Sequence, residues 1–172
     1  KVFLFVGKLE SKKQPDILAA TFMDAELNNT HLVFIGSGSL EAELKAQCRA
    51  KANVHFVGFQ NQQSMPVWYS VGDVLCLPSK GPGETWGLVV NEAMASGCAA
   101  IVSDRTGCHE DILTSDSVGI RFPADRADDL SASLRYASEH TWDRKAIQLH
   151  IGHWSFPEII KAIRLELNRV KS

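Results

Sequence analysis

The chain has 172 residues, 18 basic and 20 acidic side chains and a formal net charge of −2. Its hydrophobic content of 45% excludes a disordered tail, and its length suits a single domain over residues 1–172. The near-neutral charge argues against a general nucleic-acid binder, which is usually clearly basic. No stretch approaches the roughly 20 apolar residues that a membrane-spanning helix needs.

The chain begins abruptly, because Lys1 is followed at once by the apolar run Val2–Val6. This run is too short for the core of a signal peptide, and it lacks a cleavage site. We therefore expect a buried strand there, and we expect the chain to be a piece of a longer protein.

Elements in the first half of the chain alternate between short apolar runs and helical patterns. In order, the sequence predicts a strand at Val2–Val6, a helix entered at Pro15 and continuing to Ala25, a strand at His31–Ile35, a helix marked by Leu40, Leu44 and Cys48, a strand at Val54–Val57, a short helix at 64–71 and a strand at Asp73–Leu77.

The second half continues the alternation. The sequence predicts a helix at 88–96 that Gly97 ends, a strand at Cys98–Val102, a helical turn at 109–113, a strand at Val118–Phe122, a helix marked by Ala127, Leu130, Leu134 and Ala137, and a long terminal helix from Phe156 to Val170.

The strand patterns predict the fold class. Apolar runs without internal alternation, each followed by a helix, are typical of βα units in a parallel sheet that is covered on both faces. We therefore expect an α/β fold with a Rossmann-like, doubly wound parallel sheet. Ligands of such sheets bind at the carboxyl ends of the strands, so the loops of interest are 7–15, 36–39, 58–63, 78–87 and 103–109.

The four cysteines form no CxxC pair, and Cys76 and Cys98 lie inside apolar runs. A chain of this length needs no disulfide, so we expect buried free thiols in a reducing compartment. This favours the cytoplasm.

The loop at 78–87 is the most informative one. It reads PSKGPGETWG, and Gly81, Pro82 and Gly83 predict an irregular path. Gly87 stands where the next helix begins, and the free N–H groups of a helix N-terminus favour a phosphate.

Two carboxylates flank the start of this helix. Glu84 lies in the loop and Glu92 one turn into the helix, so we expect them at different depths of one cleft. Carboxylates accept hydrogen bonds from the vicinal hydroxyls of a sugar or ribose. An exposed loop residue and a solvated helix residue remain the alternative.

Lysines cluster just after the first strand, at Lys8, Lys12 and Lys13. Three ammonium groups beside a helix N-terminus would neutralise a pyrophosphate, whereas a solvated loop is the alternative. Gly36 and Gly38 begin a dinucleotide-type glycine pattern that lacks its third glycine, so a plain tight turn stays open.

The remaining candidate site residues give weaker sequence signals. His150 and His153 lack a third ligand nearby, which disfavours a metal site. Asp104 could contact a ligand or serve as a cap, and His109 could touch a substrate, serve as a cap or stay exposed.

Five segments in order resemble one family. They are VGKLESKKQPD, LVFIGSGSLEAEL, NVHFVGF, DVLCLPS and GETWGLVVNEAMASGCAAIVSD, the last of which is similar to the E-x7-E block. The chain resembles the C-terminal, nucleotide-sugar-binding domain of GT-B glycosyltransferases, specifically the retaining enzymes of family four. Lys8 departs from the family, which usually has arginine there, and Gln14 replaces the usual glycine.

The resemblance implies roles for matching positions. Lys13 and Lys8 would contact the donor phosphates, Glu84 would face the donor sugar and Glu92 would hold the ribose hydroxyls. The resemblance also implies donor-binding roles for Gly36, Gly38, Phe56, Gly58, Phe59, Trp86, Gly87, Leu88 and Val89. It implies no cofactor and no bound metal.

The resemblance further implies a partner, because in this fold the acceptor sits mainly on a separate N-terminal domain. We therefore expect a chain that binds a nucleotide sugar, with UDP or GDP as the default carrier, but that does not transfer sugar alone. Peripheral membrane association would come through the other domain. The alternatives are a GT-B-like nucleotide-sugar epimerase or phosphorylase, and a non-catalytic Rossmann-type ligand-binding module.

Overall fold

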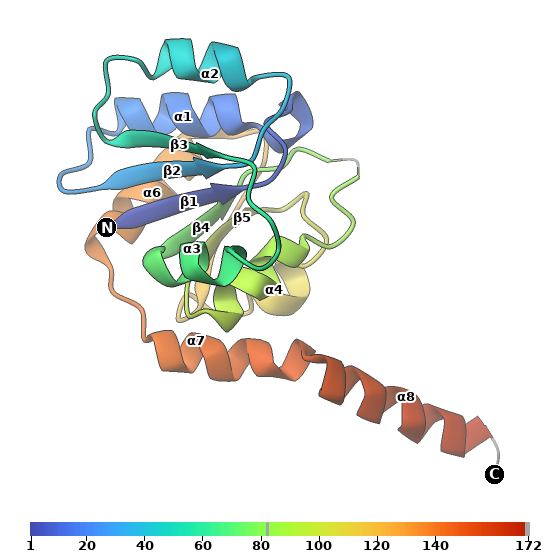
Figure 1. Ribbon diagram of the computed structural model, residues 1–172. Helices are drawn as coiled ribbons and strands as arrows, with labels where there is room; N and C mark the ends of the chain where they lie inside the picture. The colour runs from blue at the N-terminus through green and yellow to red at the C-terminus, as the bar shows by residue number, and fades with distance from the viewer. Residues whose placement is uncertain (82, 171–172) are drawn as a thin grey trace.

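Six parallel strands form one sheet in the order β3-β2-β1-β4-β5-β6 in the computed structural model, which describes residues 1–81 and 83–170 (Figure 1). Their bounds are β1 (Val2–Val6), β2 (His31–Ile35), β3 (Val54–Gly58), β4 (Val74–Leu77), β5 (Ala99–Ser103) and β6 (Gly119–Phe122). The order reverses between β1 and β4, as in a Rossmann fold. The predicted doubly wound α/β fold is confirmed. Pro82, which was expected to make its loop irregular, lies outside the described residues.

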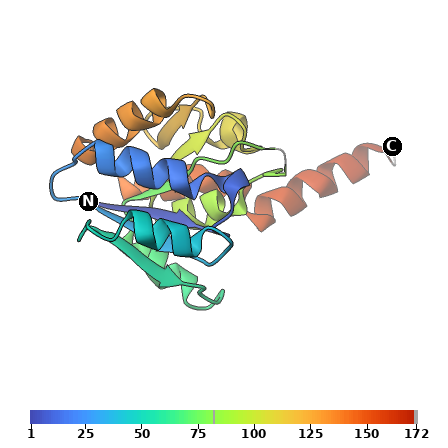
Figure 2. The same cartoon turned by 90° about the horizontal axis from the view of Figure 1, so that it is seen from above.

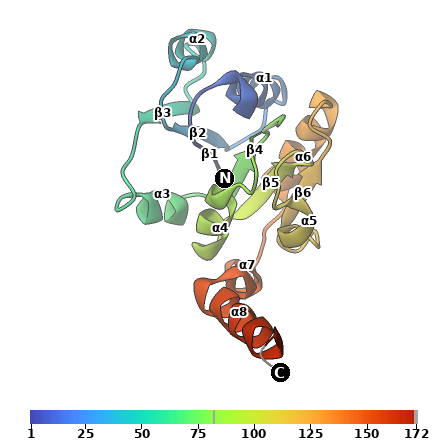
Figure 3. The same ribbon diagram turned by 90° about the vertical axis from the view of Figure 1, so that its right-hand side faces the viewer.

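Helices cover both faces of the sheet, as the end-on view in Figure 3 shows. On one face α1 (Pro15–Asp24) packs against α2 (Glu41–Gln47) and α6 (Ala127–Glu139). On the other, α4 (Leu88–Ala95) packs against α3 (Met65–Val71) and α7 (Arg144–Ile151). The short α5 (His109–Ile112) precedes β6, and the turns η1 (Ser11–Lys13) and η2 (Gly152–Trp154) complete the set with α8 (Phe156–Val170).

The central strands are buried on both faces, because each face carries a helical layer. Every residue of β4 and β5 is buried, and so are the aromatic rings of Phe3, Phe5 and Phe34. The edge strand β3 is only half-buried, with His55 exposed. The expectation of fully covered runs is therefore right at the centre of the sheet and wrong at this edge. All four cysteines are buried and free, as predicted.

Helix α7 is an element that sequence reasoning missed. Asp143 caps it, because its carboxylate accepts from the backbone N–H groups of Lys145 and Ala146. Ile147 and Ile151, one turn apart, are its buried residues. An Asp cap followed by apolar residues four apart was the signal that would have predicted it.

Arg144, the first residue of α7, joins two other helices at their C-terminal ends. Its guanidinium donates to the carbonyl oxygens of Ser70 and Gly72 at the end of α3, and of Ser96 at the end of α4, over 3.0–3.2 Å. Helix carbonyls at a C-terminus lack partners within the helix, and a cation satisfies them well. One side chain thus fixes α3 and α4 relative to each other.

Helix α8 extends away from the sheet and its helical layers, as Figures 1 and 2 show. None of its residues is buried, and its apolar side chains, among them Phe156 and Ile163, are exposed. Over residues 1–81 and 83–170, no helix is both long and apolar enough to cross a membrane.

Candidate functional site

A cavity of about 570 Å³ lies at the carboxyl ends of β1 and β2, where the loops after these strands face α3 and α4. The cavity lies next to the point between β1 and β4 at which the strand order reverses. Ligands of doubly wound folds usually bind in a crevice at this point. Six of the predicted site residues line the cavity: Lys8, Gly36, Gly38, Phe59, Val89 and Glu92. Its size is that of a typical small-molecule site.

The glycines at this edge allow two loops to pack directly on one another. A Cβ on Gly36, whose φ is +138°, would lie 1.9 Å from the carbonyl oxygen of Gly7, and one on Gly38 would lie 2.4 Å from that of Leu9. Any side chain at either position would push the loops apart. The close approach that these glycines permit is thus to the neighbouring loop, which shapes the cavity wall.

Lys13 and Glu84 form an ion pair beside this cavity. The Lys13 ammonium lies 2.5 Å from Glu84 Oε2, and both side chains are mostly buried. The hydroxyl of Ser79 donates to the same oxygen over 3.1 Å. The structure therefore brings together the loops that follow β1 and β4, and it leaves Glu84 Oε1 as the less occupied acceptor.

The three lysines after β1 diverge. The Lys13 side chain lies against Gly7, which lines the cavity. A Cβ added at Gly7 would lie 3.3 Å from Lys13 Cδ. Lys8 is exposed on the cavity wall. Lys12 instead pairs with Glu10 at 3.2 Å. The turn η1 separates these directions, so the cluster supplies two cations to the site region rather than three.

Helix α4 begins at the edge of the site. Its N-cap, Gly87, has a φ of +93°, and a Cβ there would lie 2.7 Å from Thr106 Cγ2. The first-turn N–H groups of Leu88 and Val89 have no acceptor within the helix, and they mark its positive end. The Leu88 side chain is exposed and does not line the cavity.

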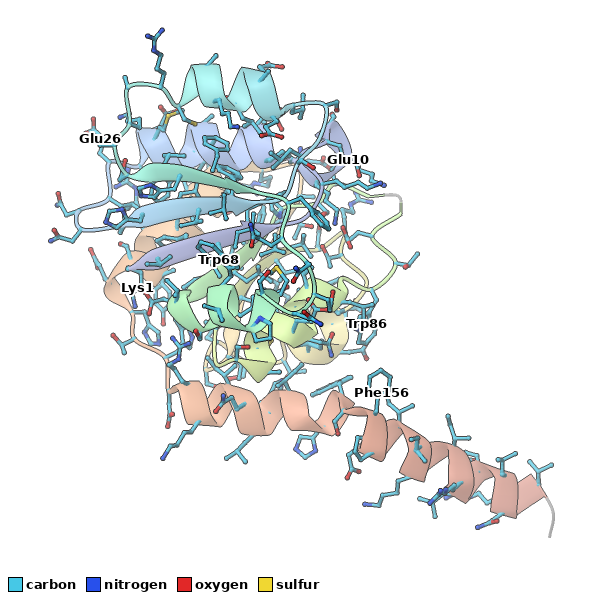
Figure 4. The ribbon with its side chains drawn as sticks, viewed as in Figure 1. Lys1, Glu10, Glu26, Trp68, Trp86 and Phe156 are labelled. Carbon is cyan, nitrogen blue, oxygen red and sulfur yellow. The ribbon has the colours of Figure 1, made fainter. Side chains whose placement is uncertain are left out.

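Trp86 stands at this helix start, as the side-chain view in Figure 4 shows. Its indole N–H donates to Asn91 Oδ1 over 2.7 Å, which fixes the ring against the first turn of α4. Trp86 therefore shapes the loop that carries Glu84, and it packs partly against the core.

Glu92 contributes a carboxylate to the cavity wall, and it is held there at both oxygens. The Tyr69 hydroxyl donates to Oε2 over 2.7 Å, and the Gln62 amide donates to Oε1 over 3.1 Å. Burial raises the pKa of Tyr69 well above its ordinary value, and the hydrogen bond to Glu92 adds to this effect. Tyr69 therefore stays protonated and remains a donor at neutral pH.

Not every predicted residue reaches the cavity. The Phe56 ring stacks on Phe34 at 5.1 Å between centroids and lies under the Lys45 ammonium, away from the residues that line the cavity. Gly58 contributes its carbonyl oxygen to Gly36 N–H over 2.8 Å. Phe59 does line the cavity, and 76% of its surface is exposed.

Two of the other sequence candidates, Asp104 and His150, have structural partners. Asp104 accepts from the backbone N–H of Ala124 over 3.0 Å, which ties the ends of β5 and β6. His150 bonds to the carbonyl oxygen of Ile112. His109 Nδ1 is buried without a hydrogen bond from the described residues. Over 1–81 and 83–170, no three His, Cys, Asp or Glu side chains form a group able to hold a metal ion.

Sequence reasoning missed Ser79, Tyr69 and Gln62. Ser79 lies two residues after the end of β4, at the carboxyl end of that strand, which was a usable signal for a site residue. Nothing in the local pattern distinguishes Tyr69 from an ordinary core residue or Gln62 from a loop residue, because their contact with Glu92 depends on how α3 packs against α4.

Comparison with known proteins gives this site a family context. The family described as Glycosyl transferases group 1 matches residues 1–148. A phosphatidyl-myo-inositol mannosyltransferase from Mycolicibacterium smegmatis is 30% identical over 138 residues, which is 78% of this chain and 35% of that protein. The chain spans about a third of the length of the curated relatives it matches.

Solved structures agree on the fold. The apo form of a lipopolysaccharide outer core galactosyltransferase superposes with a TM-score of 0.83 at 23% identity, over 95% of this chain and 47% of that one. The pneumococcal O-GlcNAc transferase in complex with UDP and GlcNAc gives a TM-score of 0.80 at 19% identity, over 98% and 35% of the two chains. These neighbours are glycosyltransferases of the GT-B fold. The chain belongs to the Glycosyl transferases group 1 family.

Proposed function

We propose that this chain is the donor-binding domain of a retaining glycosyltransferase of family four. The full protein would transfer a sugar from a nucleoside diphosphate to a saccharide or lipid-linked acceptor. The observation that carries the proposal is the arrangement around α4: a carboxylate on the cavity wall at Glu92, free N–H groups at the helix start, and the Lys13–Glu84 pair beside them. UDP in two structural neighbours supports a nucleotide-sugar donor.

Charge development explains why cations and a helix N-terminus belong here. As the glycosidic bond of the donor breaks, negative charge grows on the β-phosphate. Lys8, Lys13 and the N–H groups of Leu88 and Val89 would stabilise that charge. An ammonium has three donors, so Lys13 can contact a phosphate oxygen while it keeps its bond to Glu84.

The remaining groups bind the other parts of the donor in this proposal. Glu84, whose Oε1 is the less occupied oxygen, faces the donor sugar. Glu92 accepts from the ribose hydroxyls. Phe59, exposed at the cavity rim, supplies an apolar surface for the base.

A second domain completes the enzyme in our proposal. We place the acceptor on an N-terminal domain, so that the 172-residue chain binds donor without transferring sugar. The mannosyltransferase relative is named for phosphatidyl-myo-inositol, a lipid, which supports a lipid-linked acceptor as one option and peripheral membrane contact through that domain. The buried thiols favour a cytoplasmic location.

Calorimetry tests the proposal. The wild-type chain should bind at least one of UDP, GDP and ADP, and Lys13→Ala should weaken that binding about tenfold through loss of one charge-assisted contact. The variant Arg164→Ala on exposed α8 is the matched control and should bind as wild type. Absence of binding to all three nucleotides would favour the non-catalytic module.

A sugar phosphorylase or epimerase of the same architecture is the second candidate. It shares the cavity and the cations, so binding alone does not separate it from a transferase. Product analysis with the full-length protein does: transfer to an acceptor with retained anomeric configuration supports our proposal, and net phosphorolysis or epimerisation contradicts it.

A further inference from the structure

The Glu92 carboxylate lies on the cavity wall and is hydrogen-bonded at both of its oxygens. Tyr69 on α3 donates to one oxygen over 2.7 Å, and Gln62 in the loop before α3 donates to the other over 3.1 Å. All three side chains line the same cavity. Two separate segments of the chain thus contact one carboxylate from different directions.

Tyr69 is fixed by the interior of the fold. Its side chain is only 2% exposed, and its carbonyl oxygen accepts from the Cys98 thiol over 2.9 Å. Three residues further on, the carbonyl oxygen of Gly72 accepts from both Cys98 and Arg144. The position of the Tyr69 ring is therefore fixed by the interior of the fold, and its hydroxyl donates to Glu92 from a fixed position.

Gln62 complements this contact from the loop. A carboxylate only accepts, so the amide nitrogen of Gln62 must be the atom that faces Glu92. Each carboxylate oxygen has about two acceptor positions, and one position on each is now occupied. One position on each oxygen stays open, which matches the two acceptors that a pair of vicinal hydroxyls needs.

We propose that Tyr69 and Gln62 are positioning residues that orient the Glu92 carboxylate so that its two free acceptor positions receive the vicinal hydroxyls of a ribose. This inference rests on the proposed function, in which Glu92 binds the nucleoside. Neither residue touches the reacting atoms. Their contribution is that the acceptor is aligned before the nucleotide arrives, which lowers the entropy lost on binding.

The test compares two ligands that differ only in the ribose hydroxyls. The tightest binder among UDP, GDP and ADP and its 2′,3′-dideoxy counterpart are titrated calorimetrically into wild type, Tyr69→Phe and Gln62→Ala. Each variant should weaken binding of the ribonucleotide about three- to tenfold and leave binding of the dideoxy nucleotide within about twofold. A structural role alone would weaken both ligands equally.

Two controls keep the outcomes distinct. Tyr136→Phe removes a hydroxyl from an exposed tyrosine on α6 and should match wild type. Gln62 is exposed, so Gln62→Ala remains informative even where Tyr69→Phe destabilises the fold. An unchanged ratio of the two affinities in both variants overturns this inference while the proposed function stands. Failure of wild type to bind any of the three nucleotides overturns both.

Discussion

The ammonium of Lys13 and the carboxylate of Glu84 meet at 2.5 Å, although 71 positions separate them in the chain. Lys13 ends the turn after β1, and Glu84 lies in the loop after β4, so the pair joins the two strands between which the sheet order reverses. Both side chains are about one-sixth exposed. The pair therefore stabilises the loops that form one side of the site.

Removing one member of this pair should destabilise the chain more than removing both. Lys13→Met or Glu84→Gln leaves a mostly buried charge without its partner, and each should lower the free energy of unfolding by about 1–3 kcal/mol. The double variant should lose less than either single variant, because it leaves no unpaired charge. Urea denaturation measures all three values, and strict additivity would show that the ion pair contributes nothing to stability.

The same two variants should differ in nucleotide binding. Under the proposed function Lys13 contacts phosphate, whereas Glu84 faces the sugar. Lys13→Met should therefore weaken binding of a nucleoside diphosphate about tenfold, and Glu84→Gln should change it less than about threefold. Titration calorimetry separates the two, and equal losses would contradict this division of roles.

The apolar runs predicted the strands well, because a strand buried on both faces must be apolar throughout. β1 and β2 match their predicted bounds, β3, β4 and β6 differ by one residue at one end, and β5 is shifted by one residue at both ends. Helix α7 was missed because its buried face consists of only Ile147 and Ile151. The partial exposure of β3 could not be predicted before the strand order was known, because it follows from the position of β3 at the edge of the sheet.

The site was less predictable than the fold, for a physical reason. Lys12 and Lys13 are adjacent, yet one pairs with Glu10 and the other with Glu84, because a single turn of helix sends neighbouring side chains in different directions. The contact of Tyr69 with Glu92 depends on packing between two helices that no local pattern encodes.

Gly87→Ala should destabilise the chain by about 2–4 kcal/mol, because it combines backbone strain at a positive φ with a clash. The new methyl would lie 2.7 Å from Thr106 Cγ2 and 3.1 Å from Leu77 Cδ2. Gly83→Ala is a matched control, since its φ is +109° but its Cβ would meet none of the described residues within 4 Å. Thermal and urea unfolding compare the two, and equal losses would show that the clash is relieved without cost.

Arg144→Ala should lower the free energy of unfolding by about 2–3 kcal/mol, because three carbonyl oxygens at the ends of α3 and α4 lose a charged donor. Arg144→Lys should recover less than half of this, since an ammonium cannot reproduce the planar fork. Arg164→Ala on exposed α8 should stay within about 0.5 kcal/mol of wild type. A full recovery with lysine would mean that charge alone matters at this position.

Stability should fall at alkaline pH. Burial raises the pKa of the Cys98 and Cys108 thiols to about 12 from an ordinary value of 9.0. The unfolded chain then releases protons above pH 9 that the folded chain retains, so folding weakens as pH rises from about 9 towards 12, by up to about 1.4 kcal/mol per pH unit for each thiol.

Urea unfolding under reducing conditions at pH 8, 9.5 and 10.5 measures this slope. Cys98→Ala should reduce it by about one proton, whatever the variant does to stability at neutral pH. A slope that the variant leaves unchanged would show that this thiol titrates alike in the folded and unfolded chain.

Removal of residues 156–172 should leave the stability of the remaining chain nearly unchanged. No residue of α8 is buried, and the helix extends away from the sheet (Figure 2). Its large apolar side chains stay about half-exposed or more, and such side chains contribute little to the free energy of unfolding, so the shortened chain should unfold in urea within about 0.5 kcal/mol of the 172-residue chain. Its solubility should rise, because an exposed apolar stripe favours association. A loss above about 2 kcal/mol would mean that α8 packs on the body in solution.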